Sequence, residues 1–204
     1  MGLYSRLFFP WGCDLIMSSP RHDDVRKTLL REVRGEVLEI GFGTGLNLPH
    51  YPDHIRRITT VDVNPGMDAR ALRRIEKSPI DVDHHVLNGE ALPMDDASFD
   101  SAVSAWTLCS IEKVGKALGE LRRVLKPHGR FFFVEHGLAP DEKIRRWQRR
   151  LNPLQRTFGD GCNLDRNIGE IIEAAGFTIT QMDEFYWEKA PRSLGYTYLG
   201  TATR

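Results

Sequence analysis

Residues Val37–Asn47 have the sequence Val-Leu-Glu-Ile-Gly-Phe-Gly-Thr-Gly-Leu-Asn, and the rest of the fold can be inferred outward from them. The first four residues form a short apolar run that predicts a buried strand, and the glycines after it predict a turn into a helix. Glycine adopts positive φ and lets the backbone approach a ligand closely, while a helix N-terminus offers N–H groups to an anion. The same pattern also occurs as a purely structural turn, so by itself it indicates a nucleotide-like ligand only weakly.

Short apolar runs alternate with amphipathic segments on both sides of this stretch. The expected strands cover residues 37–40, 58–63, 82–87, 99–106 and 130–136, followed by 177–186 and 194–202. The expected helices cover residues 25–33, 65–75, 114–125 and 141–156, with a last one ending at Ala175. Strands that alternate with such helices pair in parallel through right-handed crossovers. The sequence therefore predicts an α/β fold: a doubly wound, seven-stranded, mostly parallel sheet with a C-terminal antiparallel hairpin.

The composition is that of an ordinary globular protein. The 28 Lys and Arg residues balance the 28 Asp and Glu residues, which argues against a nucleic-acid-binding surface. Cys13, Cys109 and Cys162 lie far apart and form no C-x-x-C pair, a spacing that excludes a disulfide framework or a zinc cluster. No apolar run approaches the roughly 20 residues of a membrane span. We expect a cytoplasmic single domain.

Two polar features follow the next strands. Asp62 lies 21 residues after Gly41, where an acid can accept hydrogen bonds from both hydroxyls of a ribose. Asn88-Gly89-Glu90-Ala91 follows the third expected strand. The dinucleotide fingerprint G-x-G-x-x-G needs a glycine where this chain has Leu46, and this argues against a nicotinamide oxidoreductase.

In this order, the motifs resemble those of class I S-adenosylmethionine-dependent methyltransferases. They are EIGFGTG (39–45), VDVNPGM (61–67), NGEALPMDDASFD (88–100) and LRRVLKPHGRFFFVEHG (121–137). The chain is most similar to the ubiquinone-biosynthesis-like branch. TLCSI (107–111), GDGCNL (159–164) and LGYTYLGTA (194–202) further resemble the subgroup of methyltransferase-like thiol methyltransferases.

The resemblance implies S-adenosylmethionine as cofactor and S-adenosylhomocysteine as product. Carried over by position, the residues expected around the methionine part and the ribose are Glu39, Gly41, Gly43, Gly45, Asn47 and Asp62. Those expected near the adenine are Val63, Asn64, Met67, Asn88, Gly89, Glu90 and Ala91, and those near the sulfonium are Trp106, Thr107 and Leu108.

The resemblance also divides the chain into functional segments of one methyltransferase domain, residues 1–204. We expect an N-terminal lid or helical segment (1–34), a cofactor-binding core (35–137), a basic insertion over the substrate pocket (138–165), and the last helix with the hairpin (166–204). With no separate substrate domain, the expected partner is a small apolar or amphiphilic acceptor: a thiol, a quinone-like ring or a phospholipid amine. We expect no nucleic-acid partner, and the sequence leaves the oligomeric state open.

Methyl transfer needs the acceptor aligned with an already activated methyl group, so the protein mainly orients and desolvates the reactants. A thiol needs little further help because its pKa is near 8.5 and the thiolate is the nucleophile. His136 follows the fifth strand, where ligands of open α/β sheets bind, and it is the candidate catalytic residue. Its alternative role is a supporting hydrogen bond.

The predicted acceptor pocket draws on several segments. Its candidate residues are Tyr4, Trp11, Glu135, Trp147, Asp160, Cys162, Asn163 and Tyr196. Two surface features have two possible roles each, as a lid over the pocket or as a membrane contact. They are the apolar N-terminal segment and the basic helix with Lys143, Arg145, Arg146, Arg149 and Arg150. We predict no metal site at Asp83-His84-His85, because adjacent residues of a strand point to opposite faces.

Three functions compete at this point. The first is a small-molecule methyltransferase. The second is a non-catalytic S-adenosylmethionine-binding regulatory protein, and the intact glycine turn and Asp62 fit both. The third is an RNA methyltransferase that uses the basic helix, which the balanced charge disfavours.

Overall fold

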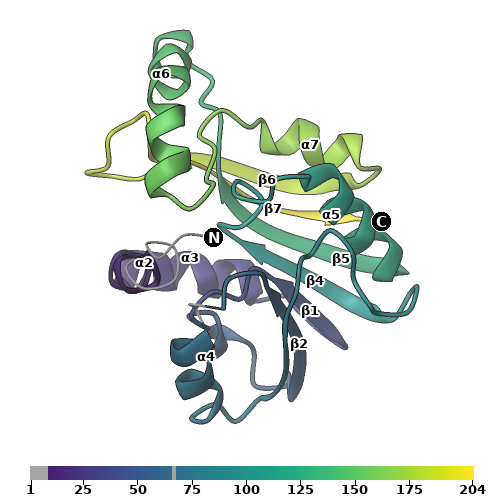
Figure 1. Ribbon diagram of the computed structural model, residues 1–204. Coiled ribbons are helices and arrows are strands. Elements are labelled where there is room, and N and C mark those ends of the chain that lie inside the picture. Colours follow the sequence, from purple (N-terminus) through teal and green to yellow (C-terminus); the bar gives the residue numbers. More distant parts are fainter. Residues whose placement is uncertain (1–8, 66–67) are drawn as a thin grey trace.

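The protein, seen here as a computed structural model that describes residues 9–65 and 68–204, is built around one sheet (Figure 1). The strands are β1 (Val37–Ile40), β2 (Arg57–Asp62), β3 (Asp81–Val86), β4 (Phe99–Ala105), β5 (Leu125–His136), β6 (Thr178–Tyr186) and β7 (Tyr196–Thr203). Their order is β3-β2-β1-β4-β5-β7-β6. The first five strands pair in parallel, and β7 lies antiparallel to both β5 and β6. The predicted doubly wound sheet with a C-terminal hairpin is confirmed.

Helices cover both faces of this sheet (Figure 1). They are α2 (Phe9–Met17), α3 (Pro20–Leu30), the 3-10 turn η1 (Leu48–His50), α4 (Asp68–Ile75), α5 (Val114–Val124), α6 (Glu142–Phe158) and α7 (Ile168–Ala174). The apolar sides of α5 and α7 pack in one core, and those of α3, η1 and α4 pack in the other.

Strand β5 shows why the chain builds two cores. Its side chains alternate between the faces of the sheet, as the period of a strand requires. Phe131 and Phe133 lie in the core with α5 and α7, while Phe132 and Val134 lie in the core with α3. The continuous apolar run is therefore that of a strand buried on both faces.

Several boundaries differ from those expected, and the helix expected at residues 25–33 is α3, Pro20–Leu30, which begins earlier because Pro20 is suited to the first turn of a helix. Strand β5 begins at Leu125 rather than residue 130, because the buried Leu125 pairs with Phe99 before a register shift in the β4–β5 ladder. Helix α4 was expected to begin at Pro65 and is described from Asp68. Residues 66–67, which lie between these two positions, are outside the described part of the chain. The N-terminal segment contains a helix of its own, α2.

The order of the strands locates the functional end of the sheet. The chain moves outward from β1 to β3 and then returns to β4 on the other side of β1. Loops on the two sides separate at such a switch point, and ligands bind there beyond the carboxyl ends of the strands. Within the described ranges, no helix combines the length and the apolar character needed to cross a bilayer.

Candidate active site

The glycine turn after β1 has the backbone that only glycine adopts easily. Gly41, Gly43 and Gly45 have φ values of 71°, 58° and 79°. A Cβ on Gly41 would lie 1.8 Å from Oγ1 of Thr107, so this residue also has no room for a side chain. The turn is thus pressed against the loop that follows β4.

Asp62, at the end of β2, holds this turn in place. Its carboxylate accepts hydrogen bonds from the backbone N–H of Gly43 at 2.7 Å and from that of Asn64 at 2.8 Å. Burial raises the pKa of Asp62, against the lowering effect of these two hydrogen bonds. The carboxylate therefore fixes two loops that border the same cavity.

Glu39, on β1, is the buried acid of the turn motif. Its carboxylate accepts hydrogen bonds from Nδ2 of Asn47 at 2.8 Å and from the hydroxyl of Tyr51 at 2.7 Å. Burial raises the pKa of Glu39 to about 7 in spite of these donors. A cation placed beside this carboxyl group would favour its charged form.

A cavity of about 970 Å³ opens over these loops. This volume is at the upper end of the range for small-molecule sites. The predicted residues that line it come from every crossover loop: Glu39, Gly41, Gly43, Asn47, Asp62, Val63, Asn64, Asn88, Gly89, Glu90, Trp106, Thr107, His136, Asp160 and Cys162. The structure thus brings together most of the residues chosen from the sequence.

Some predicted cofactor residues have other positions. Leu108 is completely buried in the core, because the chain turns its side chain inward behind Trp106 and Thr107. Ala91 and Gly45 do not line the cavity, and Gly45 shapes the turn beneath it. Met67 and Tyr4 lie outside the described residues.

Most of the predicted acceptor residues also lie away from the cavity. Trp11 and Trp147 are 60% and 54% exposed, because each lies on the outer side of its helix. Tyr196 is buried between Tyr186 and Tyr198, and its hydroxyl donates to Glu184. None of these three residues lines the cavity.

Glu135 and Asn163 position the cavity wall from behind. The buried carboxylate of Glu135 accepts hydrogen bonds from Oγ of Ser104 at 2.7 Å and from the backbone N–H groups of Thr107 and Leu108, both at 3.0 Å. Burial and the neighbouring Cys109 raise the pKa of Glu135 to about 8. Asn163 donates from its side chain to the carbonyl groups of Cys109 and Gly161. Both residues therefore order loops without lining the cavity.

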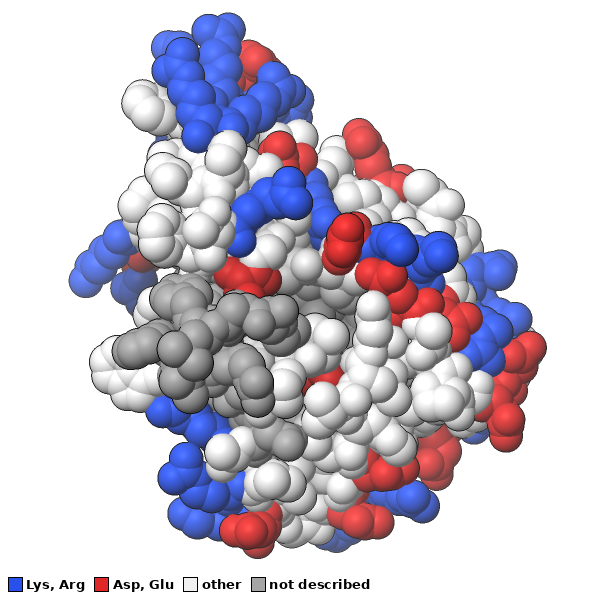
Figure 2. Space-filling model, in the orientation of Figure 1, with Lys and Arg blue, Asp and Glu red and all other residues white. Residues whose placement is uncertain are grey.

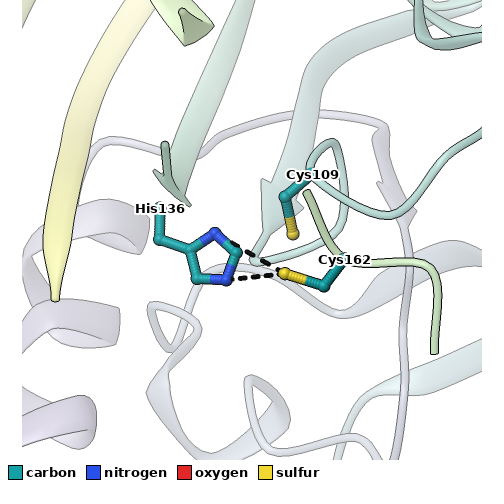
Figure 3. A group of neighbouring side chains, drawn as sticks. All are labelled: Cys109, His136 and Cys162. Carbon is teal, nitrogen blue, oxygen red and sulfur yellow. Dashed lines mark hydrogen bonds between the residues drawn. The ribbon is translucent and has the colours of Figure 1, made fainter. Parts of the chain in front are cut away.

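Sequence reasoning missed a cluster of three side chains on the cavity wall. Cys109, His136 and Cys162 point toward one another from two loops and the end of β5 (Figure 3). Sγ of Cys162 lies 2.9 Å from Nε2 of His136. Their separation in the sequence gave no sign of this grouping, because the three segments meet only where they end at the same edge of the sheet.

The cluster favours a thiolate on Cys109. A hydrogen bond from Cys162 lowers the pKa of Cys109 well below its ordinary value, against burial and with the help of His136. Burial acts to lower the pKa of His136, but the charge of Cys109 outweighs it and raises this pKa to about 9. The hydrogen bond to Cys109 and burial raise the pKa of Cys162. The three groups share charge and protons as one unit.

The cavity lining also contains an aromatic group, in which the predicted Trp106 is joined by His22 and Trp187, two residues that sequence reasoning missed. His22 stacks on Trp187 with ring centres 4.5 Å apart and contacts the edge of Trp106 at 5.3 Å. Burial lowers the pKa of His22 to about 4, so the ring is neutral at pH 7. Trp187 comes from the turn between β6 and β7, which carries no motif that marks it as part of a site.

Helix α6 contributes only one end to the cavity. Its last turns bring Gln155 and Phe158 to the lining. The basic residues that we noted in the sequence belong to its first half, and Figure 2 shows Lys and Arg side chains gathered over that end, away from the cavity. The basic surface and the pocket are therefore separate parts of one helix.

The fold and the glycine turn define a Rossmann-like domain for a nucleotide-type cofactor. Residues 38–133 match the Methyltransferase domain family. Thiol S-methyltransferase TMT1B of Rattus norvegicus is 35% identical over 159 residues, which are 76% of this chain and 64% of the relative. TMT1B of Homo sapiens is 32% identical over 190 residues, 86% of this chain and 78% of the relative.

A solved structure with the same fold is the S-adenosylmethionine-dependent methyltransferase of Aquifex aeolicus. It has a TM-score of 0.67 and 20% identity, with 95% of this chain and 97% of that chain covered. The chain belongs to the methyltransferase family that includes the thiol S-methyltransferases just described.

Replacing Asp62 by alanine should weaken the binding of S-adenosylmethionine about 10- to 100-fold. The change removes a carboxylate that orders two loops, and hydrogen bonds to a charged group contribute about 1.5–3 kcal/mol. Isothermal calorimetry measures the affinity. Asp83→Ala, a partly exposed acid on β3, is the control and should bind as the wild type does. Equal affinity in Asp62→Ala would remove Asp62 from the cofactor site.

Glu39→Gln should reduce the pH dependence of stability in the cofactor-free protein. The folded pKa of Glu39, about 7, lies above the ordinary value of 4.5. Its stabilising contribution is therefore complete below about pH 4.5 and is lost as the pH rises through about 7. Glutamine stays neutral throughout.

Urea unfolding at pH 5 and pH 7.5 measures this effect. The wild type should lose about 2 kcal/mol more than Glu39→Gln between the two values. Glu76→Gln, at an exposed site, should keep the wild-type slope. The same slope in Glu39→Gln as in the wild type would contradict the assignment.

Proposed function

We propose that this protein transfers the methyl group of S-adenosylmethionine to the sulfur of a small apolar thiol. The observation that carries the proposal is a single cavity whose floor is the glycine turn with Asp62 and whose wall is the cluster Cys109, His136 and Cys162. The thiol S-methyltransferases among the relatives support this choice of acceptor.

The lining suits an apolar acceptor. Aromatic and aliphatic side chains from α2, the end of α6 and the β6–β7 turn also line the cavity: Phe9, Ile16, Met17, Phe158, Trp187 and Leu194. Apolar walls with a few convergent polar groups are typical of small-molecule sites. The acceptor is therefore expected to bind by its apolar body and to present one polar atom.

The residues divide the chemistry among them. When bound, S-adenosylmethionine supplies a methyl group already activated by its sulfonium. Glu39, Asp62 and the glycine turn would hold the cofactor, and the aromatic side chains would exclude water from the acceptor. His136, at the end of β5, lines the same cavity and would stabilise the acceptor in its thiolate form.

A screen with labelled S-adenosylmethionine tests the acceptor class. Alkyl and aryl thiols, quinols, phenols and vesicles of phosphatidylethanolamine are offered separately, and the methylated products are identified by mass spectrometry. We expect S-methyl thioethers from the thiols at the highest rate. Product only from another class, or from none, would overturn the proposal.

His136→Ala should lower kcat for a thiol at least about tenfold and leave the affinity for S-adenosylmethionine within about twofold, because His136 belongs to the acceptor side of the cavity. His85→Gln on β3 is the matched control and should keep wild-type kinetics. Wild-type turnover in His136→Ala would leave His136 with a purely structural role.

A further inference from the structure

Cys109, His136 and Cys162 have the arrangement of metal ligands. One atom from each residue can be chosen so that all three atoms lie within 4.8 Å of one another. Zinc bond lengths of about 2.3 Å to sulfur and 2.0–2.1 Å to nitrogen, at tetrahedral angles, separate sulfur from nitrogen by about 3.6 Å and two sulfurs by about 3.8 Å. The distance of 2.9 Å between Sγ of Cys162 and Nε2 of His136 is shorter than the sulfur–nitrogen distance in such a site. The upper limit of 4.8 Å on the distances among the three atoms is longer than either ligand–ligand distance. Side-chain movements of about 1 Å or less would bring all three ligand atoms to bonding distance from one zinc ion.

The loops that carry these ligands are tied to each other. The carbonyl of Cys109 accepts hydrogen bonds from the backbone N–H of Asn163 at 2.9 Å and from its Nδ2 at 2.8 Å, and Asn163 is the neighbour of Cys162. Asp160 and Gly161 have φ values of 48° and 90°, which shape the turn that delivers Cys162. Outer hydrogen bonds of this kind orient the ligands of a metal site.

The cluster is open on one side. All three residues line the cavity, while the protein behind them is closed by the buried Glu135 and Leu108. Zinc sites with three protein ligands and one open position are catalytic sites, and thiolate ligands favour soft metals such as zinc. The open position of this cluster would face the proposed acceptor.

We propose that Cys109, His136 and Cys162 bind one zinc ion and that its fourth position takes the acceptor thiol as a thiolate. The metal site stands on the geometry alone, whereas its role in catalysis rests on the proposed thiol S-methyltransferase function. A thiol that coordinates zinc loses its proton, which leaves for solvent. The thiolate sulfur then bonds to the methyl carbon, and the electron pair of the broken carbon–sulfur bond stays on the cofactor sulfur. The products are a thioether and S-adenosylhomocysteine, so atoms and charges balance.

Cobalt(II) tests the site without any turnover. Reduced, metal-free wild-type protein titrated with Co²⁺ should show a thiolate-to-cobalt charge-transfer band and the intense visible bands of a tetrahedral ion, saturating at one equivalent, and Zn²⁺ should displace it. Cys109→Ser, Cys162→Ser and His136→Gln should each weaken binding by more than about 100-fold, since the loss of an outer-shell partner alone costs about 10- to 100-fold. Cys13→Ser and His85→Gln are the matched controls and should bind as the wild type does.

Alkylation of the wild type provides a second measurement that does not depend on whether the variants fold. Zn²⁺ should slow iodoacetamide labelling of Cys109 and Cys162 at least tenfold and leave the rate at Cys13 unchanged. No charge-transfer band in the reduced wild type, or equal protection of all three cysteines, would overturn the metal site.

Thiophenol separates the metal's role from the function itself. It should change the visible spectrum of the cobalt protein, and removal of zinc should lower S-methylation of thiophenol at least tenfold, restored by added Zn²⁺. Equal S-methylation with and without zinc would overturn the catalytic role while the proposed function stands. A different result would be that the three residues bind zinc but no thiol is methylated at any zinc concentration. That result would overturn the proposed function, while the metal site would remain supported.

Discussion

The buried carboxylate of Glu135 joins the ends of the two central strands on which the site is built. It lies on β5 and accepts from Ser104 on β4 and from the backbone of residues 107 and 108. Without it, several buried donors would lose their acceptor, at about 1–3 kcal/mol each. The loop it fixes presses Thr107 against Gly41 and carries Cys109 to the cavity. The cofactor turn and the acceptor wall therefore share one support.

The fold and the cofactor side of the cavity could be predicted because local patterns encode them. The run Val37–Ile40 before the glycines predicts a buried strand. Asp62 follows at the distance of one crossover connection, which places it at the end of the next strand. A positive φ strongly favours glycine, so Gly41 and Gly43 mark the turn in the sequence. Each of these constraints acts within a few residues, and a sequence records such constraints clearly.

The rest of the cavity depends on contacts between distant segments, and here the sequence predicted His136, Asp160 and Cys162 but not their neighbours Cys109 and Trp187. Cys109, His136 and Cys162 meet only because β4, β5 and the loop after α6 end at one edge of the sheet. Trp187 reaches the cavity from a turn without any motif, while Trp147, a bulky aromatic on an amphipathic helix, faces solvent. Residue type alone does not tell which aromatic side chain will meet the ligand, since that depends on helical phase and on neighbouring loops.

Helical phase also has a consequence for α6. Gln148 is buried and donates to the carbonyl of Gly137 while accepting from the N–H of Ala139, which fixes the rotation of the helix about its axis. Gln155 reaches the cavity because it follows Gln148 after about two full turns, and Phe158, three residues further on, is a surface neighbour of Gln155. One residue inserted between Gln148 and Gln155 would turn both side chains by about 100° away from the cavity. Evolution can therefore vary the charges of this helix freely, but it can change the helix's length only in steps of whole turns.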